Sequence, residues 1–318
     1  MKMKAVVCTG YGPPEVLKLK EVDRPVPKDN EVLIKIHAAA VTVSDCIVRS
    51  GKINILLWLP MRIFVGFGRP RKQILGLELA GEIEATGKEV KRFKKGDQVF
   101  AFTGKNFGAF AEYVSLPEEG KYMPTDSLIA IKPANISYEA AASVPARGTL
   151  ALYYLKKGNI QSGQNVLIYG ASGGVGTFAV QLAKYFGADV TGVCSTENLE
   201  MVKSIGADAV LDYTKDDLTS AGKSYDIIFD AVGNKKSSKM KLQCKNALAP
   251  NGKYISVDDG TPKISIDDLV LIKKLIELGK IKPILDRVYT LEQITEAHRY
   301  VEKGHKKGSV VIMVKHEG

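Results

Sequence analysis

Short apolar runs separated by glycine and proline fill the first third of the chain. Between Lys4 and Val114 they include KAVVCT, EVLIKIHAAAV, AGEIEAT, DQVFAF and AFAEYVSL. Runs of this length, bounded by turn residues, are typical of β-strands. We therefore expect a small, partly closed antiparallel barrel in this part of the chain.

A helical pattern begins around Ser137, in YEAAASVPARGTLALYYLKK, and Pro145 interrupts it. Beyond it, the apolar strands NVLIYG, DVTGVCS, AVLDY and YDIIFDAVG occur together with the helical segments VGTFAVQLAKYFG and NLEMVKSIG. Strands that are apolar throughout and alternate with helices form a parallel sheet that is covered on both faces. The sequence therefore predicts an α/β fold with a doubly wound parallel sheet.

The last part of the chain contains both kinds of element. After the strand GKYISVD comes one amphipathic helix, IDDLVLIKKLIELG, and then the strands PILDRVYTL and KGSVVIMV on either side of the helix LEQITEAHRYVEKG. A chain of 318 residues exceeds the usual size of one domain, about 100 to 200 residues. Two domains are therefore expected, with a boundary near residues 118–130.

Composition and charge indicate a folded protein and bear on whether it binds nucleic acid. With 45% hydrophobic and 25% charged residues, the composition is that of a folded protein. The net charge of +10 raises the question of nucleic-acid binding, since Lys and Arg attract phosphates. The charges are scattered, however, and the densest cluster, Lys88–Lys95, flanks an expected turn between strands. A solvated face is favoured, and no nucleic-acid partner is expected.

Neither a membrane anchor nor an export signal is indicated. The apolar run Ile53–Phe67 is interrupted by Pro60 and Arg62 and is shorter than the ~20 residues that span a bilayer, so we interpret it as a segment that covers a pocket. The N-terminus lacks the apolar core of a signal peptide. The cysteines lie far apart, at Cys8, Cys46, Cys194 and Cys244. Because they form no CxxC pair, neither a structural zinc site nor a disulfide framework is expected, and a cytoplasmic location fits best.

The sharpest local feature is a glycine-rich run between the strand NVLIYG and the helix that follows it. The run consists of Ala171, Ser172, Gly173, Gly174, Val175 and Gly176. In a dinucleotide-binding fold, small residues at these positions make the tight turn, admit the pyrophosphate and allow close packing of helix on strand. The helix N-terminus then offers its free amides to the phosphate. We expect a dinucleotide site here, with a merely structural turn as the alternative.

The end of the second strand decides between the two nicotinamide cofactors. NAD-specific folds place an acidic residue there, which holds the ribose 2′-hydroxyl, but this chain has Cys194 and Ser195. Without a carboxylate to repel a 2′-phosphate, and with a hydroxyl to bind it, NADPH is favoured over NADH. Tyr213, at the end of the third strand, offers a second hydroxyl. Glu197 either repels the phosphate or points to solvent.

Several motifs together resemble those of the medium-chain dehydrogenase/reductase superfamily. They are KKGDQV (94–99), GAFAEY (108–113), EAAASVPARGTLALYYL (139–155), ASGGVG (171–176), SIGADAVLDY (204–213) and the closing segment IKPILDRVYTLEQITEAHRYVEKGHKKGSVVI. The chain is most similar to the quinone oxidoreductase branch, including plastid-envelope homologues and alkenone reductases. That resemblance implies a GroES-like catalytic domain at residues 1–125, a Rossmann domain at 126–260, and a segment at 261–318 that returns to the catalytic domain. It also places the substrate in the cleft between the domains.

The zinc ligands of the zinc-dependent relatives are missing. The resemblance aligns those ligand positions with Thr42, Leu77 and Pro145, whereas zinc prefers thiolate and imidazole ligands. Without a Lewis acid, ordinary alcohol oxidation is disfavoured. Quinones and α,β-unsaturated carbonyls are better acceptors, because hydride addition yields a delocalised anion that modest hydrogen bonding stabilises.

The resemblance implies a set of candidate site residues. The candidates around the reacting centre are Thr42, Asp45, Pro145 and Thr149. Thr149 is also a candidate nicotinamide contact, as are Val232, Gly233 and Val257 at the ends of later strands. Each has a plainer interpretation: Asp45 as a helix cap, Thr149 as a packing hydroxyl. For Tyr11, Trp58 and Phe67, stacking on a flat substrate and ordinary packing both stay open.

Two functions from different classes follow. The first is NADPH-dependent reduction of quinones or enones; the second is an NADP(H)-binding protein with little turnover that serves an interaction or regulatory role. The second is suggested by the short DDGTPKIS segment after Val257, where relatives have a longer one. Since that region commonly supplies the strand that pairs two subunits, a homodimer stays open. A side activity in RNA binding is a third, weaker alternative.

Overall fold

The computed structural model describes residues 1–52, 65–216, 223–233 and 239–316. The chain divides into two compact units. The first contains residues Met1–Ala146, Ser265–Val270 and Leu285–Gly318, and the second contains Arg147–Ile264 and Leu271–Ile284. These limits differ from the domain limits expected from sequence, since the first unit extends beyond residue 125. Trp58 lies outside the described residues.

The first unit is built on β-sheets. Its strands are β1 (Lys2–Cys8), β2 (Leu17–Asp23), β3 (Glu31–Val41), β4 (Glu78–Thr86), β5 (Gln98–Phe102), β6 (Tyr113–Pro117), β7 (Leu128–Ile131), β13 (Leu285–Thr290) and β14 (Ser309–Met313). The hairpin β1–β2 stands apart from a seven-stranded sheet of order β13-β14-β3-β4-β5-β7, in which β6 also pairs with β3. Its helices are α1 (Val43–Ser50), α3 (Tyr138–Ala142) and α9 (Ile294–Lys303), with short 3-10 turns at Pro14–Val16, Gly104–Asn106 and Leu291–Gln293.

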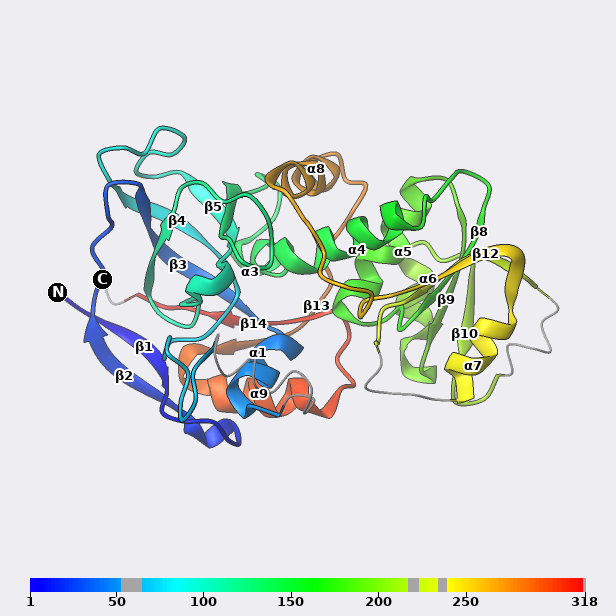
Figure 1. The fold of residues 1–318 in the computed structure, drawn as a ribbon, viewed down its shortest axis with the longest axis horizontal. Helices are drawn as coiled ribbons and strands as arrows, with labels where there is room; N and C mark the ends of the chain where they lie inside the picture. The colour runs from blue at the N-terminus through cyan, green and yellow to red at the C-terminus, as the bar shows by residue number, and fades with distance from the viewer. Residues whose placement is uncertain (53–64, 217–222, 234–238, 317–318) are drawn as a thin grey trace. The chain divides into compact units, whose positions relative to one another are not determined.

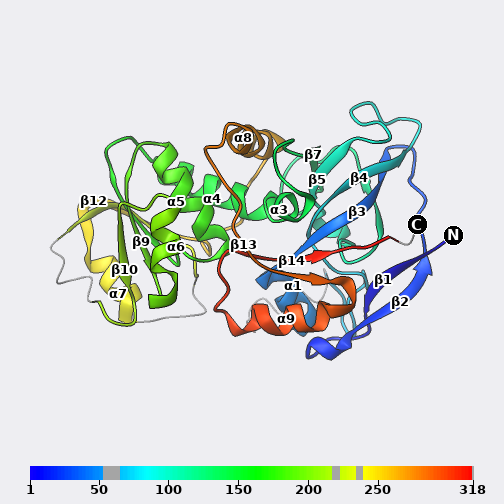
Figure 2. The ribbon, with the colours of Figure 1, turned by 180° about the vertical axis from the view of Figure 1, so that it is seen from behind.

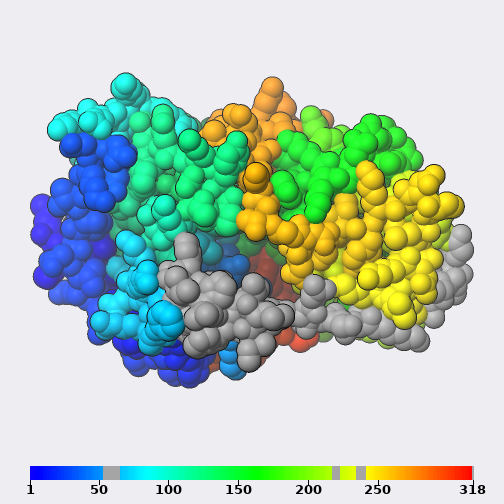
Figure 3. Space-filling view, viewed as in Figure 1, coloured from blue at the N-terminus to red at the C-terminus, as the bar shows by residue number. Residues whose placement is uncertain are grey.

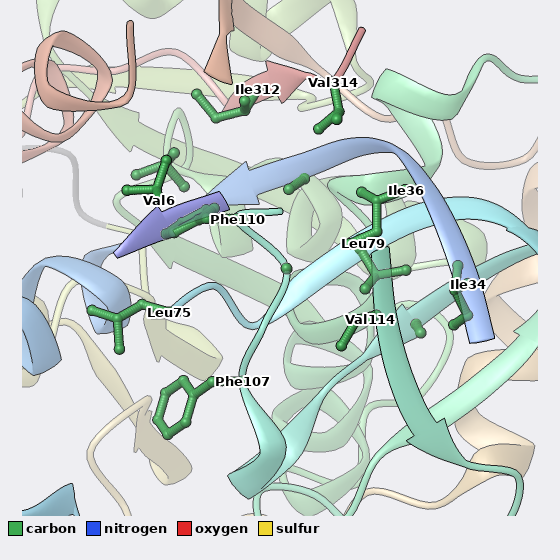
Figure 4. Packing of buried hydrophobic residues seen from close by; sticks show 14 of the residues in the cluster. Val6, Ile34, Ile36, Leu75, Leu79, Phe107, Phe110, Val114, Ile312 and Val314 are labelled. Atoms are coloured by element: carbon green, nitrogen blue, oxygen red, sulfur yellow. The ribbon is translucent and has the colours of Figure 1, made fainter. Parts of the chain in front are cut away.

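The long strand β3 organises this unit, because β4, β6 and β14 all pair with it antiparallel. The pairing with β14 brings the C-terminal segment into the same sheet as the N-terminal strands (Figure 1 and Figure 2). Apolar side chains from these strands converge on one core, which includes Val6, Ile36, Leu79, Phe110 and Ile312 (Figure 4). The predominantly antiparallel sheet matches the expected GroES-like fold.

Gly81 on β4 marks a close approach of β4 to β3. A Cβ at this position would lie 2.1 Å from the carbonyl oxygen of Lys35. The β3–β4 register shifts next to this contact, between Ile36 and Ala38, which is the mark of a β-bulge. Glycine is therefore required here so that the bent strand can stay paired.

The second unit is a parallel five-stranded sheet of order β10-β9-β8-β11-β12. The strands are β8 (Asn165–Tyr169), β9 (Asp189–Cys194), β10 (Ala209–Asp212), β11 (Tyr225–Asp230) and β12 (Leu248–Ser256). The helices are α4 (Pro145–Lys157), α5 (Gly174–Tyr185), α6 (Leu199–Ser204), α7 (Lys239–Asn246) and α8 (Ile266–Glu277), with a 3-10 turn at Thr196–Asn198. The first residues of α8, up to Val270, belong to the first unit. This strand order is that of a Rossmann fold and confirms the fold class expected from sequence.

Helix α4 begins with Pro145 in the first unit and continues into the second. Pro145 ends the preceding helical turn at α3, as its interruption of the pattern predicted, and stands where a missing N–H costs nothing. In the five-stranded sheet of the second unit, β12 is an edge strand. Residues of α7 and β12 (yellow) form a continuous part of the surface in Figure 3.

The basic cluster lies in a loop, whereas residues 53–64 of the apolar segment, which we expected to cover a pocket, lie outside the described residues. Lys88–Lys95 connects β4 to β5 through two turns, as expected. Phe67 is 56% exposed, and the Tyr11 hydroxyl donates a 2.7 Å hydrogen bond to the carbonyl of Gly66. Among the described residues, no helix is long and apolar enough to cross a membrane.

A buried histidine joins α9 to α1. The Nδ1 atom of His298 lies 3.4 Å from the Sγ atom of Cys46, and its ring packs edge-on against Phe110. His298 is fully buried, and burial, assisted by the nearby charge of Arg49, lowers its pKa to about 3. Burial also raises the pKa of the Cys46 thiol. At neutral pH both groups are therefore uncharged, and we interpret the pair as packing.

We predict that His298 makes the protein less stable in mild acid. The unfolded chain takes up a proton at this residue below a pH of about 6.5, whereas the folded chain does so only near pH 3, so stability falls as pH decreases through that window. The loss is about 2 to 3 kcal/mol between pH 7 and pH 4.5. Urea unfolding at both pH values measures it. His298→Phe should lose most of this difference, and an unchanged pH slope in that variant would contradict the assignment.

Candidate functional site

The glycine-rich run forms a tight turn between β8 and α5. Gly170 has a φ of +81°, and a Cβ on it would lie 2.5 Å from the Cγ2 atom of Val232. The N–H groups of Gly170 and Ala171 both donate to the carbonyl of Val193 at 3.0 Å. Since Val193 belongs to β9, the turn is fixed to the neighbouring strand as well as to β8.

Helix α5 starts unusually close to this turn. A Cβ on Gly176 would lie 2.1 Å from the carbonyl oxygen of Gly170, so only glycine lets the helix approach. Gly173 is the N-cap and has no side chain to accept from the first amides of α5. Those amides have no partner within the helix itself and are the groups that bind phosphate in dinucleotide folds. The turn therefore has the close geometry that the sequence of Ala171–Gly176 predicted, and its binding of a pyrophosphate stays a prediction.

The ends of β9 and β10 lie side by side next to this turn. Cys194 pairs with Asp212, and the N–H of Tyr213 donates to the carbonyl of Cys194 at 3.0 Å. Cys194 is buried, which raises the pKa of its thiol to about 11. Ser195 is half-buried and Tyr213 is 44% exposed. The strand pairing thus brings together the two hydroxyl-bearing residues that the sequence proposed for the adenosine end of a cofactor.

Two acidic residues lie in this region, Glu197 and Asp212. Glu197 is exposed. The carboxylate of Asp212 accepts hydrogen bonds from the hydroxyl of Thr196 and from the N–H and hydroxyl of Thr214, the last two at 2.9 and 2.7 Å. Asp212 therefore fixes the loops after β9 and β10.

Asn198 was missed at the sequence level. The residue is 5% exposed, and its Nδ2 atom donates to the Oγ atoms of Ser195 at 3.0 Å and Ser172 at 3.3 Å. It therefore joins the glycine-rich turn to the loop after β9. From the sequence alone, Asn198 is only the residue before a helix. No sequence pattern indicates its hydrogen bonds to Ser172 and Ser195.

A second buried network stands at the end of β11. Asp230 is fully buried; its carboxylate accepts from the N–H groups of Val232 and Gly233, both at 3.0 Å, and from the Tyr254 hydroxyl at 2.9 Å. Burial opposes its charge, but these hydrogen bonds and the Lys241 ammonium, 2.6 Å away, hold its pKa below the usual value. Asp230 thereby shapes the turn that contains two cofactor candidates. This role of Asp230 could have been predicted from the sequence, because an acidic residue stands at the end of an apolar strand.

The remaining candidates of the second unit are Thr149, Val232, Gly233 and Val257. The N–H of Val257 donates to the Asp230 carbonyl at 3.0 Å, and the Val257 carbonyl accepts from the hydroxyl of Tyr154 at 2.8 Å. Thr149 lies on α4 and is fully buried. Val232, Gly233 and Val257 follow the carboxyl ends of β11 and β12, the same edge of the sheet as the turn at Ala171–Gly176.

In the first unit, Thr42 and Asp45 form a capping box at the start of α1. The N–H and hydroxyl of Thr42 donate to Asp45 Oδ2 at 2.8 and 2.6 Å, and the Asp45 N–H donates to Thr42 Oγ1 at 3.0 Å. Asp45 is fully buried. Asp45 therefore completes the capping box at the start of α1, and capping is one of the two roles considered for it.

The other two positions aligned with zinc ligands have structural contacts. The Leu77 carbonyl accepts from the Thr103 N–H at 2.8 Å, and Pro145 opens α4. Next to them, the buried Glu78 carboxylate accepts from the Ala146 N–H at 2.6 Å at the start of that helix, where a negative charge is favoured. Within the described ranges, no group of three or more His, Cys, Asp or Glu side chains is placed to hold a metal ion.

Comparisons with known proteins agree with this architecture. Residues 28–126 match the alcohol dehydrogenase GroES-like domain, and residues 174–279 and 263–312 match two models of zinc-binding dehydrogenases. The two units thus define a GroES-like and Rossmann protein of the dehydrogenase class. The chain belongs to the medium-chain dehydrogenase/reductase superfamily, as its sequence motifs indicated.

Its relatives within the superfamily include enone reductases and a quinone oxidoreductase. The chain is 34% identical to the 2-methylene-furan-3-one reductase of Solanum lycopersicum, over 98% of this chain and 79% of that protein. It is 32% identical to the chloroplastic NADPH-dependent alkenal/one oxidoreductase of Arabidopsis thaliana, with the same coverage. The structure of the quinone oxidoreductase from Coxiella burnetii superposes with a TM-score of 0.84 at 27% identity, over 99% of this chain and all of that one.

We predict that Gly176→Ala destabilises the protein without any ligand. The added methyl group would collide with the Gly170 carbonyl, 2.1 Å away, and overpacking of this kind costs about 1 to 3 kcal/mol. Gly173→Ala is the matched control in the same turn, because its Cβ would lie 3.3 Å from the same oxygen and needs only a small shift. Urea unfolding compares the two. Equal stability of both variants would contradict the close approach of α5.

Proposed function

We propose that the protein is an NADPH-dependent oxidoreductase that transfers hydride to quinones or α,β-unsaturated carbonyl compounds without zinc. The observation that carries this proposal is the turn from β8 to α5, where Gly176 lies against the Gly170 carbonyl and the first helical amides are uncapped. The names of its relatives, which include an alkenal/one oxidoreductase and a quinone oxidoreductase, support the same reaction class. A cytoplasmic location remains part of the proposal.

The residues of the second unit would hold the cofactor along the carboxyl edge of the sheet. Ala171–Gly176 would bind the pyrophosphate, and Ser195 and Tyr213 would bind a 2′-phosphate. The end of β9, where folds that select NAD have an acid, carries Cys194 and Ser195, and the nearby Asp212 is engaged by Thr196 and Thr214. Cys194 would line this pocket. These features favour NADPH over NADH.

A catalytic zinc does not fit the residues present. At the aligned positions, Thr42 is engaged in the capping box, and Leu77 and Pro145 carry no donor atom in their side chains. Zinc sites in proteins use thiolate, imidazole or carboxylate ligands. We therefore assign no step to a metal.

The chemistry then depends on an acceptor that stabilises its own negative charge. A reduced nicotinamide, when bound, supplies the hydride. A quinone that receives it becomes a hydroquinone anion, and an enone becomes an enolate, in which the charge is delocalised; a proton from solvent completes either product. Thr149, Val232, Gly233 and Val257 would orient the nicotinamide. Thr42, Asp45 and Pro145 would shape the substrate side, with Asp45 holding Thr42 in place through the capping box.

A binding protein with little turnover is the second candidate. It is favoured by the short connection between β12 and α8, residues 257–265, which follows the edge strand of the sheet. The resemblance to the superfamily implies a longer segment at this place. A homodimer through β12 also stays a prediction. This alternative expects NADPH affinity without acceptor-dependent oxidation.

The activity test follows NADPH absorbance with purified protein and either 1,4-naphthoquinone or a short-chain alkenone. We expect acceptor-dependent oxidation, faster with NADPH than with NADH. Overnight treatment with 1,10-phenanthroline should leave the rate unchanged within about twofold, since no metal takes part. A zinc-dependent alcohol dehydrogenase treated in parallel is the control for chelation.

Each failure of this assay has its own meaning. Binding of NADPH in a calorimeter with no oxidation of it by either acceptor class would replace the reductase with the binding protein. A rate abolished by the chelator and restored by zinc would contradict zinc independence. A preference for NADH would contradict the roles of Ser195 and Tyr213.

A further inference from the structure

The carboxamide of Asn198 lies between two serine hydroxyls that come from different loops. Ser172 belongs to the turn before α5, and Ser195 follows β9. The Asn198 Nδ2 atom donates to both Oγ atoms, at 3.3 and 3.0 Å. Both hydroxyls are thereby held within reach of one amide group, on the two loops that border the adenosine end of the proposed cofactor site.

The direction of these hydrogen bonds decides what the serines can do. A hydroxyl group has one proton to donate and lone pairs to accept with. Since each serine oxygen accepts from Asn198, its own proton stays available. In the described part of the chain, neither Ser172 nor Ser195 donates its hydroxyl to another protein atom. Both hydroxyls are thus set to donate to an acceptor from outside the protein, and a phosphate offers only acceptors at neutral pH.

A second observation also points to a ligand. Asn198 is only 5% exposed. Within the described residues, its Oδ1 atom has no hydrogen-bond partner. A buried polar atom left without a partner is costly and rare in folded proteins. Oδ1 is an acceptor, so it calls for a donor group of the ligand, such as a ribose hydroxyl of a nucleotide, while the phosphate is left to the two serine hydroxyls.

We propose that Asn198 is the residue that determines cofactor specificity, by holding the hydroxyls of Ser172 and Ser195 as paired donors to the 2′-phosphate of NADPH. This inference rests on the proposed function. Asn198 is a positioning residue, because it acts through the two serines. An aspartate at the same position would accept from both hydroxyls, turn their protons away from the phosphate and add a repelling charge.

The test measures nucleotide binding to the purified apoprotein by calorimetry, with NADPH, NADH, 2′,5′-ADP and 5′-AMP as probes. We expect Asn198→Asp to raise the Kd for NADPH and for 2′,5′-ADP about tenfold or more. The Kd for NADH and 5′-AMP should change less than about threefold. The control for net charge is Asn251→Asp, an equally isosteric change at an exposed position on β12 of the same unit; it should bind all four probes as the wild type does.

If the aspartate variant folds poorly, a second set of variants decides the question. It consists of Asn198→Ala, made both in the wild type and in a double variant that carries Ser172→Ala and Ser195→Ala. Because Asn198 acts through the serines, Asn198→Ala should weaken NADPH binding in the wild type but have little further effect in the double-alanine background. Equal losses for NADPH and NADH, or an additive effect in that background, would overturn the inference. Wild-type protein that binds neither dinucleotide would instead refute the proposed function itself, and this inference with it.

Discussion

The close approach of α5 to the end of β8 is the constraint on which the second unit depends. Gly176 lies against the Gly170 carbonyl, and the N–H groups of Gly170 and Ala171 bond to Val193 on β9. One turn therefore fixes a helix start and two strand ends in a single arrangement. Because no side chain stands in the way, the free amides of α5 are presented at the edge of the sheet, which is the requirement for binding a phosphate.

Buried carboxylates maintain the remaining loops of the candidate site. Asp45 accepts from the backbone of Thr42, Glu78 from Ala146, and Asp230 from Val232 and Gly233. In each case a negative charge removed from water is satisfied by amide donors at a helix start or a turn, which makes burial tolerable. These acids order the backbone within each unit, and the chemistry we propose relies on orientation and on the reactivity of the acceptor.

Sequence reasoning recovered the parts of this protein that depend on local patterns. The tight turn at Ala171–Gly176 could be predicted because small residues at fixed spacing between a strand and a helix allow close packing, and the parallel sheet could be predicted because apolar strands alternate with helices. That the turn binds a cofactor stays a prediction. Asn198 could not, because its role depends on two serines that only the fold brings together. Asp45 was left between two roles because a capping aspartate and a catalytic one look alike in sequence; the capping box became visible only in three dimensions.

Amide hydrogen exchange with and without NADPH shows whether this edge of the second unit is the cofactor site. We expect slower exchange upon NADPH addition in residues 172–177 and 195–199, with no change in the β1–β2 hairpin. Unchanged exchange in both segments at a saturating NADPH concentration, or protection confined to the first unit, would contradict it.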